Sequence, residues 1–304
     1  MRQRKQRSNC GPDIGRDEVC SRYDSDAMCD LFAMSASYPA TVRLSLEEFA
    51  RHGGLSGSSK DGWGIAWYDA REVRIVKELF PAADSACVRF IEQHPFISPL
   101  AISHVRKATL GALALRNCQP FLRELGGRWH CFAHNGHLPG IAQDTRFPFD
   151  AHRPVGETDS EHAFCALLER LRPLWLANAA PSVAQRRQVI EAFAADLREL
   201  GPANFIYTDG EALFAHADRR HQTDGGIRPP GLWSLARRCP AGGEMTAAGL
   251  SIEARGAEQE VVLIASVALT GECWTALECG QILVACGGRL RPAPIDADVL
   301  GRLR

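Results

Sequence analysis

The chain has 304 residues, of which 45% are hydrophobic, and its formal net charge is −1. This length and composition suffice for a sizeable core in one large domain or two ordinary ones. The near-neutral charge gives no reason to expect nucleic acid or a membrane surface as a partner, and no apolar run approaches the ~18 residues of a membrane-spanning helix.

Residues 1–28 are polar and charged and show no hydrophobic periodicity. They also lack the apolar segment of a secretory signal peptide, so we expect a cytoplasmic protein. Three interpretations stay open for them: a disordered leader, a removable propeptide, or a start site assigned too early. The character of the chain changes after this segment, and we expect a single domain over residues 29–304.

The hydrophobic pattern then predicts strands, two long helices and strands again, in that order. The predicted strands are Gly64–Tyr68, Glu72–Lys77, Leu100–Val105, Trp129–His134, Asn204–Thr208, Ala212–Ala217, Val261–Ala268 and Gln281–Ala285. The predicted helices are Leu46–His52, Ala83–Gln93, Asp159–Arg172 and Ser182–Leu200. Arg219–Gly249, rich in Gly and Pro, is predicted to be a long loop.

This order differs from the alternating strands and helices of a doubly wound sheet, and no G-x-G-x-x-G or P-loop motif is present. We therefore expect an α+β fold in which two mostly antiparallel sheets pack face to face, with helices outside. The chain has eleven cysteines, and none of them are in C-x-x-C spacing. Nearly all are expected to be small, reduced core residues, and we expect no metal or cofactor.

Cys29 is the exception, because Met28-Cys29 reads as an internal start of the protein. A methionine aminopeptidase would then expose Cys29 as the first residue. An ordinary α-amino pKa of about 7.7–8.0 lies close to the about 8.5 of a free thiol, so the amine can serve as the base of its own thiol. The alternative is that Cys29 is a buried strand cysteine, and the five residues Met28–Phe32 taken alone favour it.

Three later positions offer groups that such a nucleophile needs. Arg106, at the end of an apolar strand, could hold a carboxylate with two hydrogen bonds, although a surface arginine is the simpler interpretation. Asn135 and Gly136 offer a side-chain N–H and a backbone N–H that could form an oxyanion hole, although Asn-Gly is also a hairpin signal.

Asp159 is the third, in a segment typical of a helix start. Thr158 and Glu161 have the spacing of a capping box, which would fix Asp159 rigidly enough to bind an ammonium group. A ligand with an α-amino acid head and an amide at its far end would satisfy all these groups. Glutamine is the simplest such molecule, and a γ-glutamyl compound has the same head.

These segments resemble the type 2, or N-terminal nucleophile, glutamine amidotransferases, and in particular their stand-alone bacterial group. The motifs that carry the resemblance are Met28–Ala36, Asp61–Ile65, Asn117–Phe121, Arg123–Leu125, Phe132–Gly136 and Gly156–Phe164. The resemblance implies a four-layer αββα sandwich of the Ntn-hydrolase type. It also implies Cys29 as nucleophile and Asn135 with Gly136 as oxyanion hole, with Arg106 and Asp159 binding the amino-acid head.

We place Thr109 with Arg106 and Asp159 in the substrate site. The sequence departs from the family at Lys107, Leu110 and Gln119, where relatives have tryptophan and two histidines, and at the His52-Gly53-Gly54 segment. Residues 1–28 are the most serious departure, since while they are attached the α-amine is an amide and the enzyme should be inactive.

We expect an amidohydrolase that cleaves glutamine through a Cys29 γ-glutamyl thioester, with ammonia released or passed to a separate synthase subunit. The first alternative is a γ-glutamyl peptide hydrolase of the glutathione-related or ergothioneine-pathway type. The second is a non-catalytic binding protein on the same fold.

Overall fold

The computed structural model describes residues 30–44, 61–81, 85–106, 111–177, 180–222, 224–247, 250–254 and 258–292. Cys29, Thr109 and the predicted helix Leu46–His52 lie outside these residues. Within the described part of the chain, none of the helices combines the length and the hydropathy that are needed to span a bilayer.

The first of the two main sheets contains nine strands among the described residues, all in antiparallel pairs. Seven of them follow the order β15 (Thr275–Ala276), β11 (Trp233–Cys239), β14 (Gln259–Ala265), β1 (Asp30–Leu44), β4 (Phe96–Val105), β2 (Trp63–Asp69) and β3 (Glu72–Glu78). β13 (Leu250–Glu253) pairs with the far end of β1 and with β12 (Glu244–Ala247).

The second sheet is also antiparallel. Its described strands follow the order β17 (Arg289–Arg291), β16 (Ile282–Cys286), β8 (Ala212–His216), β7 (Ala203–Thr208), β6 (Arg128–Gly136) and β5 (Phe121–Leu125). A small ribbon of β9 (Arg220–His221) and β10 (Ile227–Arg228) follows β8.

The alternation of side chains along β1 shows how the layers stack. Leu31 and Ala33 join the core cluster that lies between the two sheets. Phe32 and Met34 point the other way and pack with residues of α2 (Ala86–Gln93), so the first sheet is buried on both faces. This double burial explains why Leu31–Met34 are apolar at four successive positions, without the alternation that marks a half-exposed strand.

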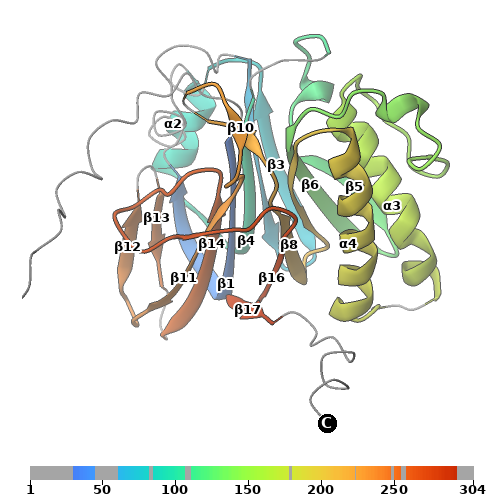
Figure 1. The fold of residues 1–304 in the computed structure, drawn as a ribbon. Helices are drawn as coiled ribbons and strands as arrows, with labels where there is room; N and C mark the ends of the chain where they lie inside the picture. Colours follow the sequence, from blue (N-terminus) through green and yellow to red (C-terminus); the bar gives the residue numbers. More distant parts are fainter. Residues whose placement is uncertain are drawn as a thin grey trace, which may run out of the picture.

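Two long helices, α3 (Asp159–Ala177) and α4 (Val183–Leu200), cover the outer face of the second sheet (Figure 1). Phe164 of α3 and Phe193 of α4 pack against Phe205 and other residues of that sheet in a third core cluster. α4 begins as predicted, because Ser182 accepts a hydrogen bond from the Gln185 amide and Gln185 returns one, which completes a capping box.

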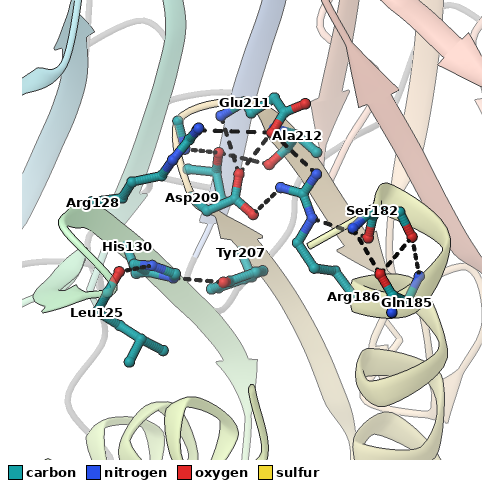
Figure 2. Close-up of polar contacts among 12 residues, drawn as sticks. Leu125, Arg128, His130, Ser182, Gln185, Arg186, Tyr207, Asp209, Glu211 and Ala212 are labelled. Carbon is teal, nitrogen blue, oxygen red and sulfur yellow. Dashed lines mark hydrogen bonds and ion pairs between the residues drawn. The ribbon is translucent and has the colours of Figure 1, made fainter. Parts of the chain in front are cut away.

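Figure 2 shows the polar network that fastens α4 to the turn after β7. Arg186 is 1% exposed and pairs with the buried Asp209, and its second nitrogen lies 3.2 Å from Glu211. Beside it, His130 Nδ1 lies 2.6 Å from the Tyr207 hydroxyl. Burial lowers the pKa of His130 to about 4 and raises the pKa of Tyr207, so both side chains are neutral at neutral pH.

The layers are therefore α2, the first sheet, the second sheet and then α3 with α4, which confirms the predicted α+β sandwich. The prediction of a long loop over Arg219–Gly249 is wrong. That segment contains β9, β10, β11 and β12, and β11 pairs along its whole length with β14. The helix predicted for Asp159–Arg172 runs on through Pro173 to Ala177.

Candidate active site

The first part of the site lies where three strands of the first sheet end together. Asp30, the first residue of β1, pairs with Val105 of β4, which pairs on its other side with Trp63 of β2. Arg106 is the residue directly after Val105, and its backbone N–H donates to the Gly62 carbonyl at 2.8 Å. Arg106 is only 4% exposed, so it is not the surface arginine that was the simpler interpretation of the sequence.

The second part is the end of β6 in the facing sheet. Asn135 and Gly136 pair with Asn204 and Ala203 of β7. The Asn135 carbonyl accepts a hydrogen bond from the Asn204 side chain at 3.2 Å. A Cβ atom at Gly136 would lie 1.9 Å from the Pro202 carbonyl oxygen, so only glycine fits this backbone.

Asp159 comes close to the same strand end. Its Oδ2 accepts the Leu138 N–H at 2.8 Å and lies 3.5 Å from His137 Nδ1, while its Oδ1 accepts the Ser160 N–H at 2.8 Å. The carboxylate thus lies beside the chain that leaves Gly136. Each carboxylate oxygen can accept more than one hydrogen bond, so these contacts leave acceptor capacity for a ligand.

The expected capping box at this helix is only half formed. Thr158 Oγ1 accepts the Glu161 N–H at 3.2 Å, as predicted for a cap. The Glu161 carboxylate, however, accepts the Gly156 N–H at 2.6 Å and pairs with Arg123. Arg123 therefore competes successfully for the carboxylate that the sequence pattern assigns to the cap.

Two buried histidines lie among these groups. Burial, together with the nearby His134 and Arg106, lowers the pKa of His104 to about 3. Burial also lowers the pKa of His134, whose Nδ1 lies 2.9 Å from Ser160 Oγ. Both rings are therefore neutral at neutral pH, as expected for structural histidines in the core.

Sequence reasoning missed a charged pair beside the predicted nucleophile position. Asp30 Oδ1 lies 4.0 Å from Arg220 Nη1, and both side chains are buried. Burial raises the pKa of Asp30 to about 7, and the Arg220 charge only partly opposes this. The position of Asp30 next to Cys29 could have indicated its place at the site. Its partner Arg220 could not be found in this way, because it belongs to the segment that was predicted to be a loop.

The structure thus places Arg106 at the end of β4 in the first sheet, and Asn135 and Gly136 at the end of β6 with Asp159 beside the chain that follows them, whereas Cys29 and Thr109 lie outside the described residues. Their catalytic and binding roles stay predictions. Among the described residues, no group of three or more His, Cys, Asp or Glu side chains is arranged to hold a metal ion.

A sequence model of the class II glutamine amidotransferases matches residues 28–298. The chain belongs to this family. It is 33% identical over 267 residues to the Escherichia coli K12 protein named "Putative glutamine amidotransferase YafJ", and the match covers 86% of this chain and 98% of that protein. The resemblance to the class II glutamine amidotransferases that the sequence motifs indicate is thereby confirmed.

Solved structures agree with the fold. The crystal structure of a predicted glutamine amidotransferase from Pseudomonas aeruginosa PA01 has a TM-score of 0.63 and 32% identity, and it covers 87% of this chain and 100% of that one. Glutamine phosphoribosylpyrophosphate amidotransferase from B. subtilis has a TM-score of 0.54 at 16% identity, and it covers 86% of this chain and 48% of that one. The second likeness concerns the fold alone.

Proposed function

We propose that this class II glutamine amidotransferase hydrolyses the γ-amide of glutamine through a γ-glutamyl thioester on Cys29. Ammonia is released or passed to a separate synthase partner. The observation that carries the proposal is the arrangement at the strand ends. Asn135 and Gly136 end β6 beside Asp159, and Arg106 follows β4 next to the strand that begins after Cys29.

Chain connectivity supports Cys29 as the nucleophile. Cys29 is the covalent neighbour of Asp30, and neighbouring Cα atoms lie about 3.8 Å apart. Asp30 pairs with Val105, the residue directly before Arg106. The proposal therefore has the nucleophile at the same strand end as the guanidinium that binds the substrate carboxylate.

The reaction follows from these groups. The Cys29 sulfur attacks the γ-carbonyl carbon, and the electron pair of the C=O bond moves to oxygen. The Asn135 amide and the Gly136 N–H donate to that oxyanion, and each donor is typically worth roughly 3–4 kcal/mol in such reactions. The α-amine of Cys29 takes the thiol proton and gives it to the leaving nitrogen, so ammonia departs and a thioester remains. Water then attacks the thioester and glutamate is released.

The amine is the favoured base because the buried histidines nearby do not suit that role. A general base works best with a pKa near the working pH, whereas the pKa of His104 is about 3 and that of His134 is lowered by burial. An α-amine of ordinary pKa, about 7.7–8.0, is much better matched.

The second candidate, hydrolysis of γ-glutamyl peptides, is favoured by one observation. The two charged groups that we assign to the substrate, Arg106 and Asp159, would both bind the amino-acid head, which glutamine shares with every γ-glutamyl compound. Neither group contacts the leaving group of the substrate. A substrate panel of glutamine, glutathione and γ-glutamyl dipeptides therefore distinguishes the two candidates.

The test compares protein beginning at Cys29 with protein that keeps residues 1–28. We expect glutaminase activity only in the first, and we expect Cys29→Ser to abolish it while Cys273→Ser, at an exposed cysteine, has no effect. Asn135→Ala should lower kcat by about 10²–10³-fold. Equal activity in the protein that keeps residues 1–28 would refute the amine as base. A folded protein that begins at Cys29 but turns over none of the panel would favour a binding protein instead.

A further inference from the structure

We propose that Asn117 and Gln119 are positioning residues, which touch no substrate but set the spacing between the oxyanion hole and the two groups that bind the amino-acid head. This inference rests on the proposed function. It concerns one short segment, Asn117–Gln119, which begins at the last residue of the 3-10 helix η2 (Leu115–Asn117) and leads towards β5. Each of its three residues contacts a residue that lies within two positions of a predicted site group or is hydrogen-bonded to one.

The side chain of Gln119 binds both backbone polar groups of His134, the residue directly before the predicted oxyanion hole. Its side-chain oxygen accepts the His134 N–H at 2.6 Å, and its side-chain nitrogen donates to the His134 carbonyl at 3.0 Å. Both residues are buried, so water does not compete for these bonds. The peptide groups on either side of His134 are thus fixed directly before Asn135.

The register of the sheet explains this contact. Phe121 of β5 pairs with Phe132 of β6, so continuing the ladder backwards brings position 119 opposite His134. The side-chain amide of Gln119 therefore takes the part of a strand peptide and extends the pairing of β6 up to the residue before Asn135.

Asn117 makes the corresponding contact near Asp159. Its Oδ1 accepts the Glu157 N–H at 2.9 Å, and its Nδ2 donates to the Glu157 carboxylate at 2.6 Å and to the Ala112 carbonyl at 2.9 Å. Asn117 is 1% exposed. It fastens the chain two residues before Asp159, at the start of α3.

Cys118, between them, lies against the first sheet. Its carbonyl accepts a hydrogen bond from Lys77 Nζ at 3.0 Å, and its sulfur would lie 3.0 Å from a Cβ atom added at Gly62. The Gly62 carbonyl accepts the Arg106 N–H. One rigid segment therefore touches the neighbours of Arg106, Asn135 and Asp159, which come from three separate elements.

This arrangement predicts that the two side chains affect different kinetic constants. A shifted oxyanion hole weakens stabilisation that exists only in the transition state, so it lowers kcat and leaves substrate binding unchanged. A shifted Asp159 weakens binding of the amino-acid head in the ground state and the transition state alike, so it raises KM and leaves kcat unchanged. A merely structural role would move both constants and the unfolding temperature together.

The experiment uses protein that begins at Cys29, with glutamine as substrate and glutamate as a competitive probe of head binding. We expect Gln119→Leu to lower kcat by about 10²-fold, as for a misplaced catalytic group, with KM and the glutamate Ki within about threefold. If Gln119→Leu does not fold, Gln119→Glu serves in its place. It has the same shape and keeps the acceptor but loses the donor to the His134 carbonyl. Gln143→Leu, at an exposed position, is the matched control.

Asn117→Asp should raise KM and the glutamate Ki by about tenfold with kcat within about threefold, because it loses both donor bonds and places two carboxylates together. The double variant Asn117→Asp with Glu157→Gln restores a donor and an acceptor to this contact and should recover most of the lost affinity. Proportional losses of kcat and affinity in both single variants, or no recovery in the double variant, would overturn the proposal. A folded parent without glutaminase activity would overturn the proposed function as well, whereas an active parent with unselective variants overturns only the positioning role.

Discussion

Asp30 Oδ1 lies 4.0 Å from Arg220 Nη1, although the two residues belong to strands of different sheets. Asp30 is the first residue of β1, and Arg220 lies in the ribbon that follows β8. Asn204 ties this ribbon to the predicted oxyanion hole. Its side chain donates to the carbonyls of Asn135 and Arg219, and it accepts the N–H of Asp218 at 2.7 Å. Buried polar contacts therefore connect the start of β1 to the end of β6.

The Asp30 carboxyl should make stability depend on pH. Its pKa in the folded protein is about 7, above its ordinary 3.8, so folding favours the protonated form. Its contribution is fully present below about pH 4 and is lost as pH rises through 7, by roughly 4 kcal/mol at most. We expect the unfolding temperature of Asp30→Asn to rise relative to that of the parent between pH 4 and pH 8. Thermal unfolding of both proteins across this range measures it, and a constant difference would contradict it.

The buried ion pair of α4 should be essential as a pair. Removing Arg186 leaves the buried Asp209 without its partner, and Arg186→Met should lower the free energy of unfolding by about 3–5 kcal/mol. Adding Asp209→Asn should recover a large part of that loss. Arg74→Met removes an exposed pair with Asp69 and should cost less than about 1 kcal/mol. Denaturant unfolding separates these cases, and similar losses for Arg74 and Arg186 would show that burial does not decide the energy.

Gly136 should tolerate no side chain. A methyl group there would lie 1.9 Å from the Pro202 oxygen and 2.7 Å from His134 Nε2. Gly136→Ala should therefore push β6 away from Pro202, with a loss of about 1–3 kcal/mol in stability from overpacking and a loss of activity. Gly271→Ala is the control, because an added Cβ at Gly271 would meet no atom within 4 Å. Thermal unfolding and glutaminase assays on both variants measure this, and equal stability and activity of the two variants would contradict the prediction.

The predicted head-binding groups should govern KM. Arg106→Lys keeps the charge but loses the planar fork that can bind a carboxylate through two hydrogen bonds, so we expect KM for glutamine to rise about tenfold or more. Asp159→Asn should do the same by removing the charge opposite the ammonium group. Arg74→Lys, on the exposed face of β3, is the control. Steady-state kinetics decide the matter, and an unchanged KM in both variants would remove Arg106 and Asp159 from the site.

The elements that carry a clear local pattern were predictable, namely α2, α3, α4 and eight of the strands, whereas the central strand β1 and strands such as β5 and β11 were not predicted. The start of α4 is an example, since the helix predicted from Ser182 begins there, with a capping box of Ser182 and Gln185 whose bonds span only three residues. The positions of Arg106, Asn135 and Asp159 at the ends of elements were also predictable, as each follows, ends or begins an element that periodicity locates, whereas their roles stay predictions. The motif order in the sequence was enough to identify the family to which the chain belongs.

The contacts between distant segments were decided only by the tertiary structure. β11 lies in a Gly- and Pro-rich stretch and becomes a strand because β14 pairs with it. The Asp30–Arg220 pair and the hold of Gln119 on His134 likewise join residues that no local period relates. The physical reason is that strand pairing and burial depend on the partner that the fold supplies, whereas periodicity reports only which face of an element is apolar.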